Sequence, residues 1–137
     1  MGSINKIGVL YGGSSSEREI SLQSGLGVHK AILELGFDSK LIDYRNIEDL
    51  GTLKNYDFVF IALHGQDGES GELQSFLQQN NIPYTGSGYE ACKNTWNKDT
   101  FKKILRENGI PTPNWISVPS LDKFKGNLDD SIFDQFR

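Results

Sequence analysis

Residues 6–22 combine a short apolar run, two glycines and a second apolar series at helical spacing. The run over residues 6–11 (KIGVLY) predicts a strand, and Gly12 and Gly13 predict a tight turn, because glycine adopts backbone angles that a Cβ forbids. The three serines that follow can cap the free N–H groups of a helix that begins near Glu17. Open α/β sheets bind ligands beyond the carboxyl ends of their strands, so this turn is a candidate ligand site.

Glu17 is the candidate functional residue of this turn. The loop GGSSS lacks the G-x-G-x-x-G spacing of dinucleotide sites, and no Gly-Lys-Ser/Thr follows it as in a Walker loop. It offers instead a carboxylate in the first helical turn. Two interpretations remain open: a stabiliser of the helix start, worth about 0.3–1 kcal/mol through the helix dipole, or a carboxylate that binds a ligand.

Composition excludes several classes of protein. The formal net charge is −4 and the pI is near 5.1, which argues against a nucleic-acid partner because phosphate binding needs clustered Lys and Arg. No run of about 18 apolar residues predicts a membrane span, and the start of the chain shows no signal peptide, so we expect a cytoplasmic protein. The single cysteine, Cys92, excludes an internal disulfide and is interpreted as a packed thiol.

The first half of the chain continues in alternating elements. A helix is predicted over residues 16–35, in which Gly25 and Gly27 suggest close packing against a neighbouring element. A half-exposed strand is predicted over residues 37–43. Residues 57–63 (DFVFIAL) place six apolar residues after an aspartate, the pattern of a central parallel strand covered on both faces.

The second half repeats this alternation. His64 ends the apolar strand and opens a second glycine-rich loop, which lies at the same edge of the sheet as the first. A helix is predicted from Ser70, followed by a fourth strand over residues 82–85, a helical stretch that ends near Thr95, and a helix capped by Asn97. The order of these elements predicts a small, mostly parallel sheet flanked by helices.

Residues 111–113 (PTP) mark the best candidate for a domain boundary, because two prolines follow a helix stop. We therefore expect one α/β domain over residues 4–112 and the truncated start of a second domain over residues 113–137. A strand is predicted over residues 115–118. The apolar series between residues 128 and 136 has no later sequence to pack against, so we expect the chain to be cut off inside its next domain.

Three motifs closely resemble the amino-terminal domain of D-alanine–D-alanine ligases. They are residues 12–22 (GGSSSEREISL), 60–74 (FIALHGQDGESGELQ) and 83–88 (PYTGSG), and the resemblance extends over about residues 6–118. It implies a Rossmann-like pre-ATP-grasp domain of a cytoplasmic bacterial enzyme. Such an enzyme joins two D-alanines for peptidoglycan through an acyl-phosphate, using ATP and Mg²⁺, and is a homodimer paired through this domain. The resemblance implies no metal ligand within this chain, because the acidic magnesium ligands would lie further along.

The resemblance also implies roles for five residues. Glu17 and His64 correspond to catalytic residues: Glu17 receives the ammonium of the first D-alanine, and His64 lies near its carboxylate and the acyl-phosphate. Ile20 corresponds to an apolar contact with the methyl group of that D-alanine, although a core position explains it equally well. Glu69 matches an acidic position that supports His64 or its loop. Lys98 corresponds to a lysine that reaches the ATP phosphates, although Asn97 stands before it where many relatives have Asp.

Other functions remain open at this point. A related ligase that uses D-lactate or D-serine as second substrate would share the same amino-terminal domain. A non-catalytic α/β module for binding or dimerisation could keep the same pocket without the reaction. A Rossmann dehydrogenase domain is disfavoured, because its glycine spacing is missing.

Overall fold

The structure, a computed structural model, describes residues 4–117. The chain divides into two units, Met1–Trp96 and Asn97–Arg137. The elements of the first unit are β1 (Lys6–Tyr11), α1 (Arg18–Glu34), β2 (Asp38–Asp43), the 3₁₀ helices η1 (Tyr44–Asn46) and η2 (Leu50–Asn55), β3 (Phe58–Ile61), α2 (Gln66–Glu69), α3 (Glu72–Gln79) and α4 (Tyr89–Trp96). The second unit contains α5 (Lys98–Glu107).

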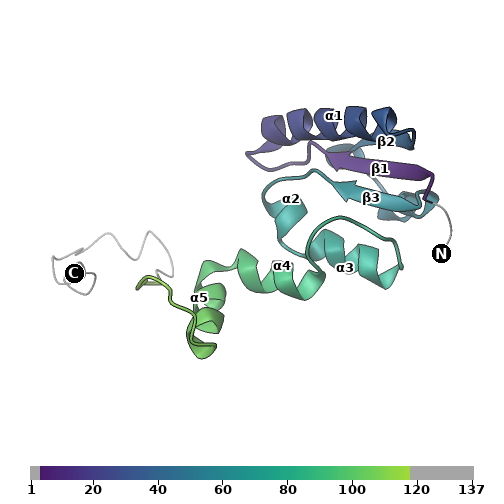
Figure 1. The fold of residues 1–137 in the computed structure, drawn as a ribbon. Helices are drawn as coiled ribbons and strands as arrows, with labels where there is room; N and C mark the ends of the chain where they lie inside the picture. The colour runs from purple at the N-terminus through teal and green to yellow at the C-terminus, as the bar shows by residue number, and fades with distance from the viewer. Residues whose placement is uncertain (1–3, 118–137) are drawn as a thin grey trace. The chain divides into compact units, whose positions relative to one another are not determined.

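The three strands form one parallel sheet in the order β2-β1-β3 (Figure 1). The predicted α/β class is confirmed, but β1 is the central strand rather than β3. In the register of the sheet, Tyr11 pairs with Asp43, and Leu10 pairs with Ile61. The carboxyl ends of all three strands therefore meet at one edge, and the loops that carry Glu17 and His64 both start there.

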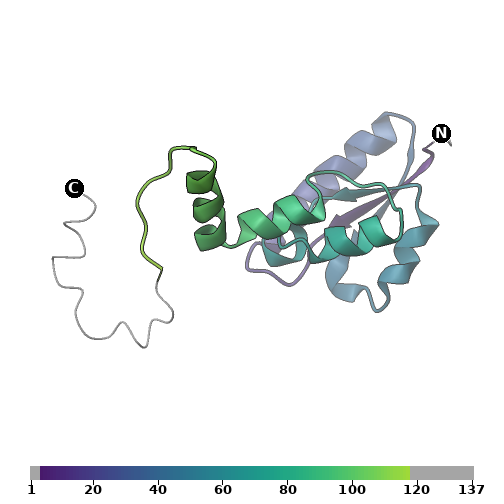
Figure 2. The ribbon, with the colours of Figure 1, turned by 90° about the horizontal axis from the view of Figure 1, so that it is seen from below.

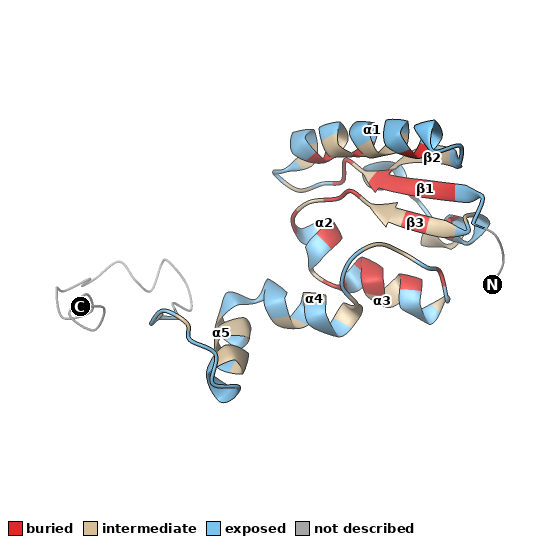
Figure 3. Cartoon of the chain, in the orientation of Figure 1, coloured by how far each residue is buried: buried red, intermediate tan, exposed pale blue. Residues whose placement is uncertain are grey.

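The side chains of β1 alternate between two small cores. Ile7 and Val9 pack with Ile32 of α1 on one face of the sheet, whereas Leu10 packs with Leu73 and the rest of a second cluster on the other. Figures 1 and 2 show the two covering layers, with α1 on one side of the sheet and α3 on the other. The interior of β1 is buried throughout, as Figure 3 shows, because helices cover both faces.

Helix α1 lies very close to β1 at one glycine. A Cβ placed on Gly25 would lie 2.3 Å from Cβ of Tyr11, so only glycine fits at this contact. The predicted packing role is confirmed for Gly25. It is wrong for Gly27, where a Cβ would meet no atom within 4 Å.

Two predicted strands are corrected. Residues 82–85 contribute only a single bridge, between Val59 and Tyr84, because the side-chain hydroxyl of Thr85 takes the N–H of Ile61 that the next ladder bond would use. Residues 115–117 form no strand, and Val118 lies outside the described residues. The apolar series predicted between residues 128 and 136 also lies outside them.

In the second unit, Asn97 caps α5 as predicted, with its Oδ1 accepting the N–H of Thr100 at 3.0 Å. After α5 the chain turns back along it, and the Arg106 guanidinium lies 4.2 Å from the ring centroid of Trp115. The domain boundary predicted after residue 112 stays a prediction. Within residues 4–117, no helix is both long and apolar enough to cross a membrane.

Candidate functional site

The loop between β1 and α1 is held by two glycines with positive φ and by an ion pair. Gly12 and Gly13 have φ of 74° and 76°, angles that favour glycine. The turn of this loop lies later than predicted, at residues 16–17, where the N–H of Arg18 donates to the carbonyl of Ser15 at 3.2 Å. Arg18, in the first turn of α1, donates from Nη1 to the carbonyl of Gly13 at 2.9 Å. It also forms a bidentate pair with Asp43 at the end of β2, at 2.9 and 2.5 Å.

The position of Asp43 couples the end of β2 to the glycine loop. Its Oδ1 accepts the N–H of Gly13 at 3.4 Å and that of Arg45 at 3.2 Å, in addition to the bonds from Arg18. The hydrogen bonds from Arg18, followed by those from the backbone of Arg45 and Gly13, hold the pKa of Asp43 below its ordinary value, although burial opposes them. Ionised Asp43 is therefore part of the folded loop.

We expect this pair to make the stability of the protein acid-sensitive. Because the pKa of Asp43 is lower in the folded state, its contribution is complete above the ordinary aspartate pKa of about 4 and is lost as the pH falls through the folded value. The free energy of unfolding, measured with urea, should fall from about pH 5 to about pH 2 less steeply in Asp43→Asn than in the wild type. Equal slopes would contradict the coupling.

A second carboxylate joins the two glycine-rich loops. Asp67, in α2, accepts the N–H of Ser14 at 2.5 Å through Oδ2. The same oxygen would lie 2.6 Å from a Cβ on Gly13, so the close approach of the two loops requires glycine there. Asp67 therefore fixes the serine loop against the loop that follows β3.

The backbone of His64 and Gly65 makes two hydrogen bonds with neighbouring side chains and a close contact with Glu17. The hydroxyl of Ser15 donates to the carbonyl of His64 at 2.9 Å, and the N–H of Gly65 donates to Oε1 of Glu69 at 3.1 Å. Gly65 has φ of 71°, and a Cβ there would lie 3.0 Å from Oε2 of Glu17. The carboxylate of Glu17 thus lies directly against Gly65, although the two residues are 48 positions apart in the sequence.

Glu17 precedes α1 as its N-cap residue, but its side chain does not cap the helix. The predicted serine cap is not formed either: Oγ of Ser15 accepts the N–H of Glu17 at 3.2 Å, which is a local serine turn before the helix and not a bond to a helical N–H. Within residues 4–117, the Glu17 carboxylate accepts no hydrogen bond in the structure. A stabilising effect on the helix dipole remains, but the carboxylate is left available to a ligand.

This carboxylate borders a hollow of about 360 Å³ at the carboxyl edge of the sheet. Because Glu17 and Asp67 are both acidic, the hollow suits a small ligand that carries a positive charge. Residues of the two loops and the side chain of Trp96 complete the lining. The residues that line the hollow are Ser14, Ser15, Ser16, Glu17, Gly65, Gln66, Asp67 and Trp96.

The other predicted site residues lie in different surroundings. His64 lies three residues after the end of β3 and does not line the hollow, which corrects the prediction that it ends the strand. Its ring is turned toward α1, where Nε2 lies 3.2 Å from Oγ of Ser24. Oε1 of Glu69 accepts the N–H of Gly65, and the role expected for Glu69 stays a prediction. Ile20 is 57% exposed and does not line the hollow. Lys98 is exposed at the start of α5 in the second unit, where it lines a separate hollow.

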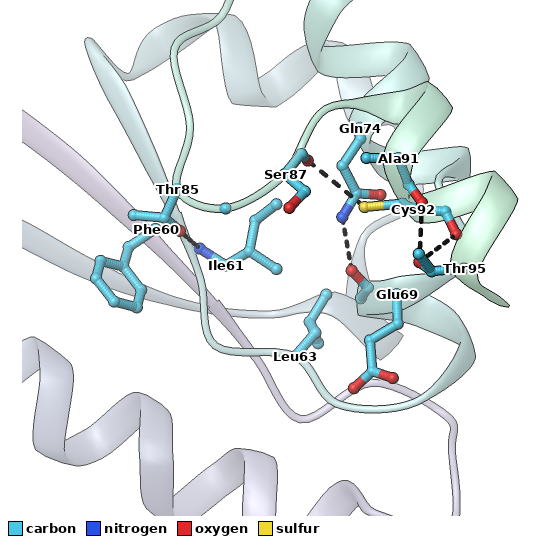
Figure 4. A pocket seen from close by; sticks show the side chains of 12 residues that line it. Phe60, Ile61, Leu63, Glu69, Gln74, Thr85, Ser87, Ala91, Cys92 and Thr95 are labelled. Atoms are coloured by element: carbon cyan, nitrogen blue, oxygen red, sulfur yellow. Dashed lines mark hydrogen bonds between the residues drawn. The ribbon is translucent and has the colours of Figure 1, made fainter. Parts of the chain in front are cut away.

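A second hollow lies between β3, residues 85–87 and α4 (Figure 4). The Cys92 thiol faces it and donates weakly to the carbonyl of Ser87 at 3.5 Å. Burial raises the pKa of this thiol, which favours the interpretation as a packed thiol. Gln74 is 4% exposed and donates to the carbonyl of Gly68 at 2.6 Å, but its Oε1 has no hydrogen-bond partner among the described residues.

Sequence reasoning missed four residues that build the site: the polar Ser24, Asp43 and Asp67, and the aromatic Trp96. Asp43 carried a usable signal, because it ends a predicted parallel strand and therefore reaches the same edge as the glycine loop. Asp67 lies in a loop that was singled out, but nothing in its spacing assigned it to Ser14. Ser24 and Trp96 gave no signal, since each contacts the site only through tertiary packing.

Comparison with known proteins links this geometry to one group of enzymes. A family model described as "D-ala D-ala ligase N-terminus" matches residues 38–87. A D-alanine–D-alanine ligase of Carboxydothermus hydrogenoformans is 50% identical over 113 residues, which are 82% of this chain and 36% of that protein. One of Bordetella avium is 46% identical over 117 residues, 84% of this chain and 37% of that protein.

Solved structures agree with the sequence relatives. A D-alanine–D-alanine ligase of Bacillus anthracis complexed with ATP superposes with a TM-score of 0.75 and 34% identity, over 90% of this chain and 45% of that one. D-alanyl-alanine synthetase A of Vibrio cholerae superposes with a TM-score of 0.73 and 28% identity, over 90% of this chain and 44% of that one. The chain spans a little over a third of the length of the curated relatives.

Proposed function

We propose that this chain, which belongs to the D-alanine–D-alanine ligase family through its amino-terminal domain, binds the first D-alanine in an ATP-dependent ligase. The whole enzyme would join two D-alanines through an acyl-phosphate and supply the dipeptide to peptidoglycan. The observation that carries the proposal is the Glu17 carboxylate, which borders the hollow and lies against Gly65 without a hydrogen bond from any described residue.

Glu17 is the proposed acceptor for the substrate ammonium. A bond from N⁺–H to O⁻ is charge-assisted and about twice as strong as a neutral one, so this carboxylate can anchor the ammonium end of a small amino acid. Glu69 and Ser15 act through the backbone, because they fix the loop at His64 and Gly65 on which the carboxylate rests. His64 is the proposed donor to the substrate carboxylate or the phosphoryl group. The methyl contact proposed for Ile20 rests on the resemblance alone, because Ile20 is exposed and does not line the hollow.

ATP and Mg²⁺ are the proposed cofactors. ATP would supply the phosphoryl group that activates the first D-alanine, and Mg²⁺ would neutralise the phosphate charge. Lys98 suits a phosphate contact because it is an exposed cation at the start of α5. The resemblance places the acidic magnesium ligands in other parts of the enzyme, and we propose them there. Among residues 4–117, no group of three or more His, Cys, Asp or Glu side chains is arranged for a metal ion.

A homodimer joined through this domain and a cytoplasmic location complete the proposal. Both the homodimer and the cytoplasmic location are inferred from the resemblance. No nucleic acid or membrane is proposed as a partner. Ligases that take D-lactate or D-serine as second substrate stay an alternative, because residues outside the first D-alanine site would select that substrate. A non-catalytic binding or dimerisation module is the alternative from another class.

Calorimetric titration of the chain with D-alanine tests the substrate assignment. We expect saturable binding in roughly the millimolar range, because a ligand of this size held by a few polar contacts gains only about 4 kcal/mol. L-alanine is the matched control, since it has the same charges and the opposite hand. Equal binding of both, or of neither, would contradict a D-alanine site.

A further inference from the structure

The imidazole of His64 is engaged through only one of its two nitrogens. Nε2 lies 3.2 Å from Oγ of Ser24, which comes from the middle of α1. Both side chains are half-buried. Among residues 4–117, no hydrogen-bond partner of Nδ1 is found. Any ligand that hydrogen-bonds to this ring must therefore use Nδ1.

We propose that Ser24 is a positioning residue that donates its hydroxyl proton to Nε2 and so keeps the proton of the neutral ring on Nδ1. A neutral imidazole has one donor and one acceptor nitrogen, and the bond made at one nitrogen sets the state of the other. If Nε2 accepts from Ser24, then Nδ1 carries the N–H. If Nε2 instead donated to Ser24, Nδ1 would present a lone pair.

The distinction matters for the chemistry of the site. This step rests on the proposed function, in which the ring faces a carboxylate or a phosphoryl oxygen. Both of these groups are hydrogen-bond acceptors, so only the Nδ1–H form can donate to them without first taking up a proton. Ser24 would thereby prepare a neutral donor before the substrate arrives.

The other histidine of the chain provides an internal comparison. His29, which follows Ser24 by five residues in α1, is engaged through the opposite nitrogen, since its Nδ1 lies 2.8 Å from Oγ of Ser39 in β2. Both rings thus contact one serine hydroxyl each and come from the same domain. The two rings differ in which nitrogen contacts the serine. A spectrum that shows both rings in the same sample therefore compares them at the same pH and temperature.

Long-range ¹H–¹⁵N NMR of the uniformly labelled chain tests the proposal without any substrate. The spectrum distinguishes a protonated ring nitrogen from an unprotonated one by its shift and its couplings. It should be recorded at about pH 8, above the ordinary imidazole pKa of about 6.5. We expect Nδ1 of His64 to be protonated and Nε2 to be unprotonated. A protonated Nε2 in the wild type would overturn the proposal.

Two substitutions separate positioning from packing. Ser24→Ala should convert the single His64 form into a mixture of both, whereas Ser24→Thr, which keeps the hydroxyl, should preserve the Nδ1–H form. Ser39→Ala is the matched control and should alter His29 alone. An unchanged His64 spectrum in Ser24→Ala would also overturn the proposal. If Ser24→Ala fails to fold, the wild-type spectrum and Ser24→Thr still decide it.

Addition of D-alanine then separates this inference from the proposed function. We expect the Nδ1 resonance of His64 to shift on titration, and the shift to be lost in Glu17→Gln. A protonated Nδ1 that does not respond to D-alanine would leave Ser24 as the positioning residue and contradict the substrate assignment. A response at Nε2 instead would contradict the positioning.

Discussion

Replacing Glu17 by glutamine should weaken the use of the first D-alanine by roughly 10- to 150-fold. The substitution keeps the shape of the side chain and removes the charge that borders the hollow. Losing one charge-assisted hydrogen bond costs about 1.5–3 kcal/mol, which corresponds to this range. The measurement is the D-alanine concentration for half-maximal rate in a full-length ligase that carries this domain. The corresponding value for ATP should change little.

Glu19→Gln is the matched control for this experiment. Glu19 lies in the first turn of α1, as close to the helix start as Glu17, but does not line the hollow. Both substitutions remove a negative charge that favours the helix dipole, so both should cost a similar, small amount of stability. Only Glu17→Gln should affect D-alanine. Equal effects of the two would mean that Glu17 acts through the helix start and not through the substrate.

Gly25→Ala should destabilise the fold by about 1–3 kcal/mol or more. The added Cβ would lie 2.3 Å from Cβ of Tyr11, and 2.8 Å from Cγ of its ring. Tyr11 cannot move its Cβ away without moving β1, so α1 must shift off the sheet and lose contacts on that face. Urea unfolding measures this loss. Because α1 carries Ser24, the same substitution should also disturb the His64 ring.

Gly27→Ala is the control, because a Cβ there would meet no atom within 4 Å. Alanine is favoured over glycine in a helix interior by about 1 kcal/mol, so this variant should be more stable than the wild type. Opposite signs for two glycines two positions apart are the expected result. If both substitutions lowered the free energy of unfolding by the same amount, the difference in packing between Gly25 and Gly27 would be contradicted.

Local patterns were enough to predict most of the elements and the principal candidate of the site. The apolar run, the glycine pair and the serines predicted β1, the loop after it and the start of α1, because each depends on residues close in sequence. The cap of α5 shows this most directly, because Asn97 accepts the N–H of Thr100, three residues away. The placement of Glu17 and His64 at one sheet edge followed from the parallel order of the strands.

Contacts between distant residues decided the rest. Gly25 and Gly27 are both glycines of α1. Gly25 packs against Tyr11, whereas Gly27 has no such neighbour, and the sequence does not distinguish the two. The fourth strand is reduced to a bridge at Tyr84, because Thr85 bonds to β3 through its side chain. Sequence periodicity carries no information about which strand a hydroxyl will reach.

The same division applies to the site. Its chemistry follows from residue type and from position at the ends of strands, so a carboxylate and an imidazole could be named from the sequence. Their environment depends on partners 40 to 53 positions away: Ser24 for the ring of His64, Ser15 for its carbonyl, and Asp67 for the N–H of Ser14. Such hydrogen bonds form only when the packed sheet brings the loops together, and they determine which nitrogen of His64 remains for a ligand.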